Sequence, residues 1–266
     1  MILWSQRVKE PQMKCRWLLI GAFLGTTLAC SLIERTPAPA ETAWQATVDA
    51  LVALRSGLGL PEHLRSDSPV RHPDDFDTNA YFSVLKHLSM APGYVLDYVY
   101  YMDGMGGHPV LYARPAEQAP YAAYDDYAAA VGGRPDPHAY LAHVQADGTA
   151  ESYFELALLR TMAGQFYLYW HAGYNDTTLV CSREAAEALI ADNVFGISMP
   201  KRDQAAVRRL DFEPQVDLRD EAAVVRVVTF TKWGGFFEDT FSFRRDSPHT
   251  LLDLESDELV PYDCGV

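Results

Sequence analysis

The amino-acid sequence predicts an α+β fold in which helices pack on a mainly antiparallel sheet that ends in a C-terminal β-meander. Helix-like segments are mixed with hairpin-like strand pairs, and regular strand–helix units of a doubly wound sheet do not recur. After residue 213 the chain has strand composition interrupted only by turn residues. The 266 residues are 48% hydrophobic and 12% aromatic, which is typical of a globular protein.

Apolar residues at helical spacing predict the helices. The first begins at Glu41 or Thr42 and extends to about residue 56, and its apolar stripe contains Trp44, Val48 and Leu51. We expect further helices over residues 79–88, 124–131, 150–164 and 183–192, with Asp77 or Thr78, Thr149 and Ser182 as N-cap residues. Residues 62–77, the rest of 114–137 and 194–213 are expected to be loops or irregular.

Aromatic and β-branched runs predict the strands. Residues 94–102 and 109–113 flank the glycine-rich segment 103–107, which predicts a β-hairpin. Shorter strands are expected over 138–145, 166–170 and 177–181, with a turn at 173–176. The predicted C-terminal strands cover residues 215–219, 222–231, 236–243, 250–254 and 258–262, and the apolar run 223–231 is expected to be central.

The N-terminal segment from Met13 to Cys30 has the pattern of a secretory signal. Lys14 and Arg16 precede thirteen uncharged residues that end in Ala29. In a helix these thirteen residues reach about 20 Å, which is too short for a hydrocarbon core of about 30 Å. The start of translation that serves this signal is expected at Met13 rather than at residue 1.

This segment resembles the signal of bacterial lipoproteins, because Leu28-Ala29-Cys30 matches the end of their lipobox. The resemblance implies cleavage after Ala29 and acylation of Cys30, which would anchor the chain to a membrane outside the cytoplasm. Ser31 stands where an inner-membrane retention aspartate would sit, so the outer membrane is favoured in a cell that has one. An ordinary cleaved signal, with Cys30 incidental, and an uncleaved anchor remain alternatives.

The expected organisation therefore has three parts. Residues 1–29 form the signal peptide, residues 30–41 the lipidated cysteine and a proline-rich spacer, and residues 42–266 a single α+β domain. Removing the signal changes the net charge from −14 to −17, since four basic residues and one acidic residue leave with it. Such an acidic surface disfavours nucleic acid and anionic head groups. The simplest interpretation of the acidity is solubility outside the cell, and the alternative is attraction of cations or a basic partner.

Two cysteines, Cys181 and Cys264, remain after the signal is accounted for. In an exported protein a remaining pair more often forms a disulfide than two thiols. Closing this long loop would stabilise the fold by about 4–5 kcal/mol in the chain-entropy model. We therefore expect a Cys181–Cys264 disulfide, with two unbonded cysteines as the alternative.

No familiar catalytic motif is present in the sequence, which lacks GxSxG, P-loop, HExxH and strand-linked GxGxxG patterns. The weak candidates for catalysis are His171 and Asp176, since a histidine beside a carboxylate can act as a general base; a simple hairpin turn is the alternative. The weak candidates for binding are Asp103 and His108 in the glycine-rich hairpin, where turn chemistry is again the alternative. No metal site and no cofactor are expected.

Together these observations predict a lipid-anchored protein of the bacterial cell envelope that faces away from the cytoplasm. Its expected role is to bind a small ligand or a neighbouring envelope protein, without nucleic acid as a partner. One alternative is a small-molecule hydrolase or other enzyme that uses His171 and a nearby acid, although the missing motifs favour a protein that is not an enzyme. A structural or assembly factor is a third possibility.

Overall fold

The computed structural model describes residues 41–191 and 196–265. All of them belong to one compact unit. The predicted signal peptide, the lipidation of Cys30 and nearly all of the spacer lie outside the described residues. Within them, no helix combines the length and apolar character that crossing a membrane requires.

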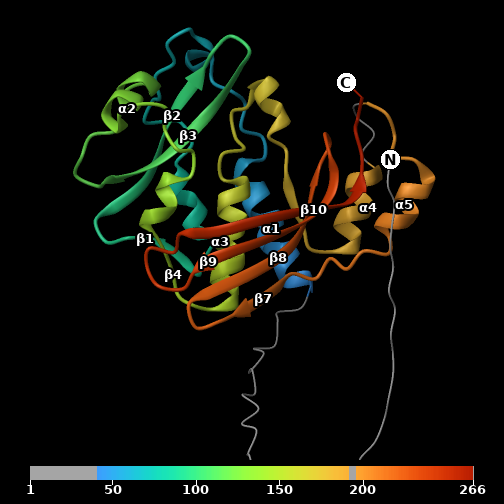
Figure 1. Ribbon diagram of the computed structural model, residues 1–266. Coiled ribbons are helices and arrows are strands. Elements are labelled where there is room, and N and C mark those ends of the chain that lie inside the picture. The colour runs from blue at the N-terminus through green and yellow to red at the C-terminus, as the bar shows by residue number, and fades with distance from the viewer. Residues whose placement is uncertain (1–40, 192–195, 266) are drawn as a thin grey trace, which may run out of the picture. The chain divides into compact units, whose positions relative to one another are not determined.

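The α+β prediction is confirmed, and every strand pair that the structure describes is antiparallel. The largest sheet has the order β10-β9-β8-β6, and β7 also pairs with β8. Its strands are β6 (Thr178–Val180), β7 (Gln215–Leu218), β8 (Ala222–Thr231), β9 (Gly235–Arg244) and β10 (Leu251–Pro261). As expected, β8 is central, and β8 to β10 form the C-terminal meander (Figure 1).

Strand β10 is a single edge strand, where the sequence suggested two strands separated by a break. Residues 255–258 remain paired with β9, and register shifts occur between Leu251 and Asp253 and between Glu258 and Val260. The polar run that suggested the break is exposed rather than looped, because β10 has only one neighbouring strand. Asp253, Glu255, Asp257 and Glu258 all lie on this exposed edge.

Two smaller sheets contain the remaining strands. The sequence-predicted hairpin is present as β2 (Tyr94–Met102) and β3 (Gly106–Pro115), and β3 also pairs with the short β5 (Tyr169–Trp170). Strands β1 (Leu88–Met90) and β4 (Val144–Ala146) form a two-stranded sheet. The expected longer strand 166–170 is thus reduced to its last two residues.

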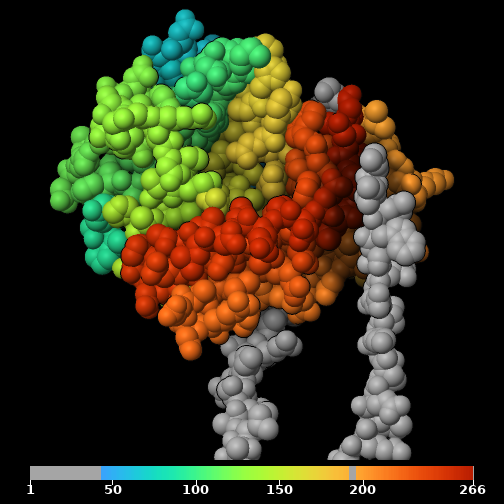
Figure 2. Space-filling view, in the orientation of Figure 1, coloured from blue at the N-terminus to red at the C-terminus, as the bar shows by residue number. Residues whose placement is uncertain are grey.

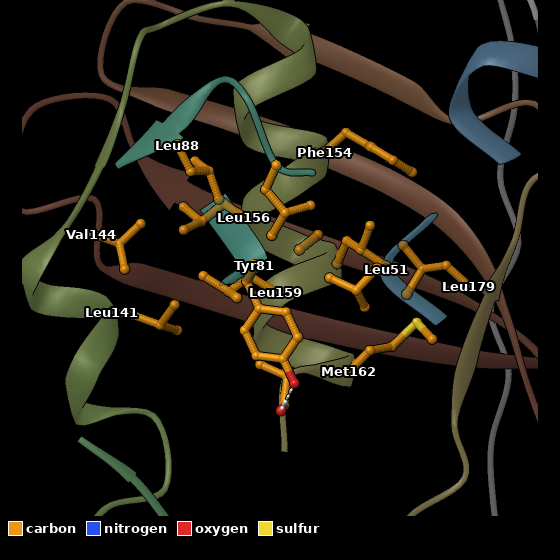
Figure 3. Close-up of a cluster of buried hydrophobic side chains, with 14 of the residues drawn as sticks. Leu51, Tyr81, Leu88, Leu141, Val144, Phe154, Leu156, Leu159, Met162 and Leu179 are labelled. Carbon is orange, nitrogen blue, oxygen red and sulfur yellow. Dashed lines mark hydrogen bonds between the residues drawn. The ribbon is translucent and has the colours of Figure 1, made fainter. Parts of the chain in front are cut away.

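The main core surrounds α3 (Ala150–Met162), which is buried on nearly every side. A helix that is apolar around its circumference belongs inside a protein, and α3 lies behind β8 to β10 next to α1 (Glu41–Arg55) (Figure 1). In Figure 3, side chains from both helices meet those of neighbouring segments, including Leu51, Phe154, Leu159 and Leu179. The Tyr81 hydroxyl donates a 2.7 Å hydrogen bond to the Ala163 carbonyl just beyond α3.

Smaller helices cover the remaining sheet surfaces. Helix α2 (Tyr124–Val131) has the predicted bounds and packs Tyr127 on β2 and β3. Helix α4 (Arg183–Ala191) also agrees closely with its prediction. Helix α5 (Lys201–Val207) was missed, because its short sequence contains few apolar residues; it buries Val207 in a second core with Ile190 and Phe236.

Two element predictions are wrong in kind. The expected helix 79–88 is a 3-10 helix, η2 (Thr78–Ser83), followed by a turn and β1. The expected strand 138–145 is mostly the 3-10 helix η3 (Ala139–His143). Tyr140, Leu141 and Val144 are all buried, and this spacing of three to four residues fits a helical turn better than strand alternation. The remaining 3-10 helices are η1 (Glu62–Arg65) and η4 (His171–Tyr174).

Cys181 and Cys264 are both buried, and the structure shows no bond between them. Cys181 follows β6, one residue beyond the pair Val180–Val228, whereas the Cys264 amide donates to the Lys232 carbonyl past the other end of β8. Five residues of strand separate these two levels, which is about 16 Å. A disulfide needs Cα atoms about 4.4–6.8 Å apart, so the Cys181–Cys264 pairing, which stays a prediction, would require these two segments to lie closer together than they do here.

A buried ion triad lies on β2, which is an edge strand of its sheet. Asp97 is 2% exposed and contacts Arg71 at 2.8 Å through Oδ1 and Arg114 at 2.7 Å through Oδ2. The loop that carries Arg71 continues to Asn79, whose side-chain amide bonds both the Leu96 amide and the Leu96 carbonyl. The loop thereby takes the place of a further strand along this edge.

Candidate binding site

Three turns that are distant in sequence meet on one surface. Gly106 and Gly107 of β3 pair with Trp170 and Tyr169 of β5, which brings the β2–β3 turn beside η4. The ring centroids of Tyr174 in η4 and Trp233 in the β8–β9 turn are 4.4 Å apart. In Figure 2 the yellow segment that contains β5 and η4 accordingly lies between the green hairpin and the red C-terminal strands.

Asp103 folds the β2–β3 turn. Its Oδ1 accepts hydrogen bonds from the amides of Met105 at 2.9 Å and Gly106 at 3.0 Å, and Oδ2 accepts one from the Tyr101 hydroxyl at 3.3 Å. The bond from Met105 is the main reason that the pKa of Asp103 is lowered from its ordinary value. Asp103 thus has the turn-forming role that was the alternative to ligand binding.

His108 faces Tyr101 across the β2–β3 pair, and the ring centroids are 5.3 Å apart. Burial lowers the pKa of its imidazole, and the nearby Asp103 carboxylate opposes this shift only in part. The neutral imidazole of His108 packs beside Tyr101 and stabilises the hairpin. His108 is half-buried beside Tyr101, whose ring packs on Tyr124 of α2.

His171 is at the centre of that surface. Its Nδ1 is 2.9 Å from the Tyr174 hydroxyl, its ring stacks on Trp170 with centroids 4.7 Å apart, and its backbone amide donates to the Met105 carbonyl at 3.3 Å. The structure therefore brings His171 next to the turn that contains Asp103, as a shared site would require.

Asp176 is engaged elsewhere. One of its carboxylate oxygens accepts a hydrogen bond from the Thr231 hydroxyl, and the other accepts a 3.0 Å hydrogen bond from the Lys232 amide. Asp176 thus fastens the turn that carries Trp233, and the structure gives it no hydrogen bond to His171 within the described residues. The geometry supports a positioning role for Asp176 in the surface, rather than a His–Asp catalytic pair.

Trp170 has an unusual backbone. Its φ of 46° and ψ of −120° are the angles that glycine adopts at the first central position of a type II′ turn. A non-glycine residue held in such a region costs of order 1–3 kcal/mol. The side chain gains little burial in return, since it is 61% exposed. The fold therefore holds a strained tryptophan facing solvent.

We define the aromatic surface as Met105, Tyr169, Trp170, His171, Tyr174 and Trp233. Four of its rings form a continuous series from Trp170 through His171 and Tyr174 to Trp233. Met105, Tyr169, Trp170 and Tyr174 are among the exposed large hydrophobic side chains. Beyond Trp233 lies an open pocket of about 430 Å³, whose lining includes Asp203, Glu258 and Asp263, so the aromatic series ends at an acidic margin.

The sequence identified His171 as a candidate residue, but it missed Met105 and Trp233. Trp233 falls between the predicted strands 222–231 and 236–243, and it is half-buried at the edge of the surface. Only the pairing of β3 with β5 and the position of the β8–β9 turn unite these residues. In the part of the chain that the structure describes, no three His, Cys, Asp or Glu side chains are grouped so that they could hold a metal ion.

Comparisons with protein-family models, curated proteins and solved structures found no match to this chain. The fold and the site define an α+β protein with an exposed, preformed aromatic surface.

Gly106 allows the close approach on which this surface depends. A Cβ atom added to Gly106 would lie 2.9 Å from the Ala172 amide nitrogen and 3.3 Å from the Tyr169 carbonyl oxygen. We expect Gly106→Ala to destabilise the protein by about 1–3 kcal/mol, because backbone atoms must move to relieve the overlap. Gly173→Ala in η4 is a matched control, since nothing lies within 4 Å of its added Cβ.

Urea unfolding of both variants measures this difference. A Gly106→Ala variant as stable as Gly173→Ala would show that the hairpin and η4 are not held in contact.

Proposed function

We propose that this chain is a lipid-anchored, extracytoplasmic binding module of the bacterial cell envelope, and that the aromatic surface binds a neighbouring envelope protein. Trp, Tyr and Met are enriched at the centres of protein interfaces, and tryptophan and tyrosine provide much of the binding energy there. The acidic margin beside Trp233 and the net negative charge favour a partner with apolar side chains next to basic ones.

The observation that carries the proposal is the strained, exposed Trp170. Strain of this kind persists when the surrounding structure imposes it, and it clusters at functional sites. Here the β3–β5 pairing on one side and the ring of His171 on the other hold Trp170 in place. A rigid aromatic side chain that is already positioned loses little conformational entropy on binding.

Site-specific photo-crosslinking in intact cells tests the proposal. A photoreactive amino acid replaces Tyr174, which is 50% exposed in the aromatic surface, or Val131, which is equally exposed at the end of α2. We expect a discrete crosslinked protein from position 174 and none from position 131. The same crosslink should disappear when Trp170→Gly is added.

Trp170→Gly should leave stability unchanged or raise it slightly, because the relief of about 1–3 kcal/mol of strain exceeds the added backbone entropy of glycine, about 0.5–1 kcal/mol. Thermal unfolding of the purified variant checks this. A crosslink at position 174 that persists in the Trp170→Gly protein would contradict the proposed role of the surface.

The anchor requires a separate experiment on Cys30. We expect the mature protein to begin at an acylated Cys30 and to partition with membranes, whereas a Cys30→Ser variant should lose the lipid mass and leave the membrane fraction. Mass spectrometry of the N-terminal peptide distinguishes the cases. An unmodified Cys30 in the wild-type protein would remove the anchor without affecting the binding surface.

A further inference from the structure

A second pocket, of about 500 Å³, lies on the side of the main core between α1, α3 and the segment that follows η2. Three alanines and Thr47 of α1 leave room for it, and Trp44 and Phe154 contribute to its lining, with ring centroids 4.5 Å apart. Its charged lining residues are Glu151 and Glu155 of α3 together with Lys86 and His87.

Glu155 is the unusual group in this pocket. Its side chain is only 4% exposed, and its Oε2 accepts a 2.9 Å hydrogen bond from the His87 amide. Burial raises its pKa to about 7, although the His87 amide and the His87 ring favour the ionised form. Glu151, one helical turn before it, lines the same pocket, so two carboxyl groups at i and i+4 share one space.

The charged side chains that face Glu155 do not form an ion pair with its carboxylate among the described residues. The His87 ring is paired with Asp147, with 2.8 Å between Nδ1 and Oδ2, and this carboxylate itself raises the pKa of Glu155. Lys86 is exposed, and the described residues of α1 contribute no ionisable side chain to the lining. Trp44 of α1 also lines the pocket, and its indole N–H is buried and has no hydrogen-bond partner among the described residues.

We propose that this pocket binds a small organic amine in its ammonium form, with the charge at Glu155 and Glu151 and a neighbouring oxygen of the ligand available to the Trp44 N–H. An ammonium group would give the buried carboxylate of Glu155 a counter-charge. The aromatic rings and alanines would contact the carbon atoms of the ligand. This proposal does not depend on the aromatic surface or on its partner.

Binding of a cation favours the ionised form of Glu155, so it must be coupled to proton release. An amine that requires ionised Glu155 should bind about tenfold more tightly or better at about pH 8 than at about pH 5.5, because the carboxyl is largely protonated at the lower pH. The amine itself stays protonated across this range, which isolates the contribution of the protein.

Isothermal titration calorimetry with ethanolamine tests the proposal, and ethylene glycol, in which a neutral hydroxyl replaces the ammonium, is the matched neutral probe. We expect saturable binding of ethanolamine only, proton uptake by the buffer, and the stated pH dependence. Glu155→Gln, checked for folding by circular dichroism, should weaken binding at about pH 8 by about tenfold or more and reduce the pH dependence to the part that His87 contributes from the same pocket. Glu184→Gln on α4 should change nothing.

Three outcomes would overturn the proposal: no saturable binding of ethanolamine, equal binding of ethylene glycol, or unchanged affinity of the Glu155→Gln protein. Thr47→Leu provides an independent variant, since a larger side chain would fill the pocket while all charges remain. It should also reduce the affinity.

Discussion

Asp97→Asn is expected to destabilise the protein by about 3–5 kcal/mol, because removal of one partner from a buried ion network leaves the other charges uncompensated. Arg71 and Arg114 are each only 16% exposed, and both lose their carboxylate partner in this variant. Arg114 also donates to the Gln118 carbonyl, so the loop after β3 should loosen as well. Urea unfolding monitored by tryptophan fluorescence measures the loss.

Asp217→Asn is the matched control for this effect. Asp217 contacts Arg219 at 2.9 Å, a distance close to those in the triad, but its side chain is half exposed. Exposed ion pairs contribute about 0–1 kcal/mol, so this control should change stability little. Equal effects of the two substitutions would show that burial of Asp97 does not determine its contribution.

Glu155 is expected to make stability fall as pH rises from about 4.5 to 7. Its pKa is raised from 4.5 to about 7 by folding, so the folded state binds more protons than the unfolded state within this interval. The stabilising contribution is complete below the unfolded pKa and is lost as pH passes the folded pKa. At 1.36 kcal/mol per pKa unit, the loss is about 3 kcal/mol.

Glu155→Gln should remove this dependence and should make the protein about 3 kcal/mol more stable than the wild type near pH 8. At about pH 4.5 the two proteins should have similar stability, because both then carry a neutral group that accepts the His87 amide bond. Unfolding free energies across the pH range test this. His87, whose raised pKa adds a fall in stability of the same sign, is present in both proteins and largely cancels in the comparison. Parallel curves would contradict a buried, protonated Glu155.

The sequence identified local elements well where one pattern was strong. Strand β8 and helix α2 have the expected bounds, because the pattern that predicts each of them lies within its own residues. The pattern is a long β-branched run in β8 and a short alanine-rich segment in α2. The prediction for segment 138–145 failed, because its composition suggested a strand, whereas the spacing of Tyr140, Leu141 and Val144 and their burial in the main core favour a helical turn. The β10 prediction failed for a related reason, since an exposed edge strand can be polar along its whole length.

The candidate sites depended on contacts that local patterns do not encode. His171 and Asp103 were identified individually, but their proximity follows from the pairing of β3 with β5, which only two residue pairs establish. Glu155 was not singled out, because a glutamate in an amphipathic helix normally faces water. Only the packing of α3 on all sides buries it. The position of Cys264 beside Lys232 was hidden for the same reason.

The acidic edge of β10 has a consequence for crowded copies of this protein. If two such edges paired as neighbouring strands, carboxylates of one chain would lie about 5 Å from those of the other, and like charges at that spacing repel. The negative charges on this edge therefore oppose self-assembly into extended sheets; they belong to Asp253, Glu255, Asp257 and Glu258. Molecules concentrated on a surface would remain separate, with their other faces accessible.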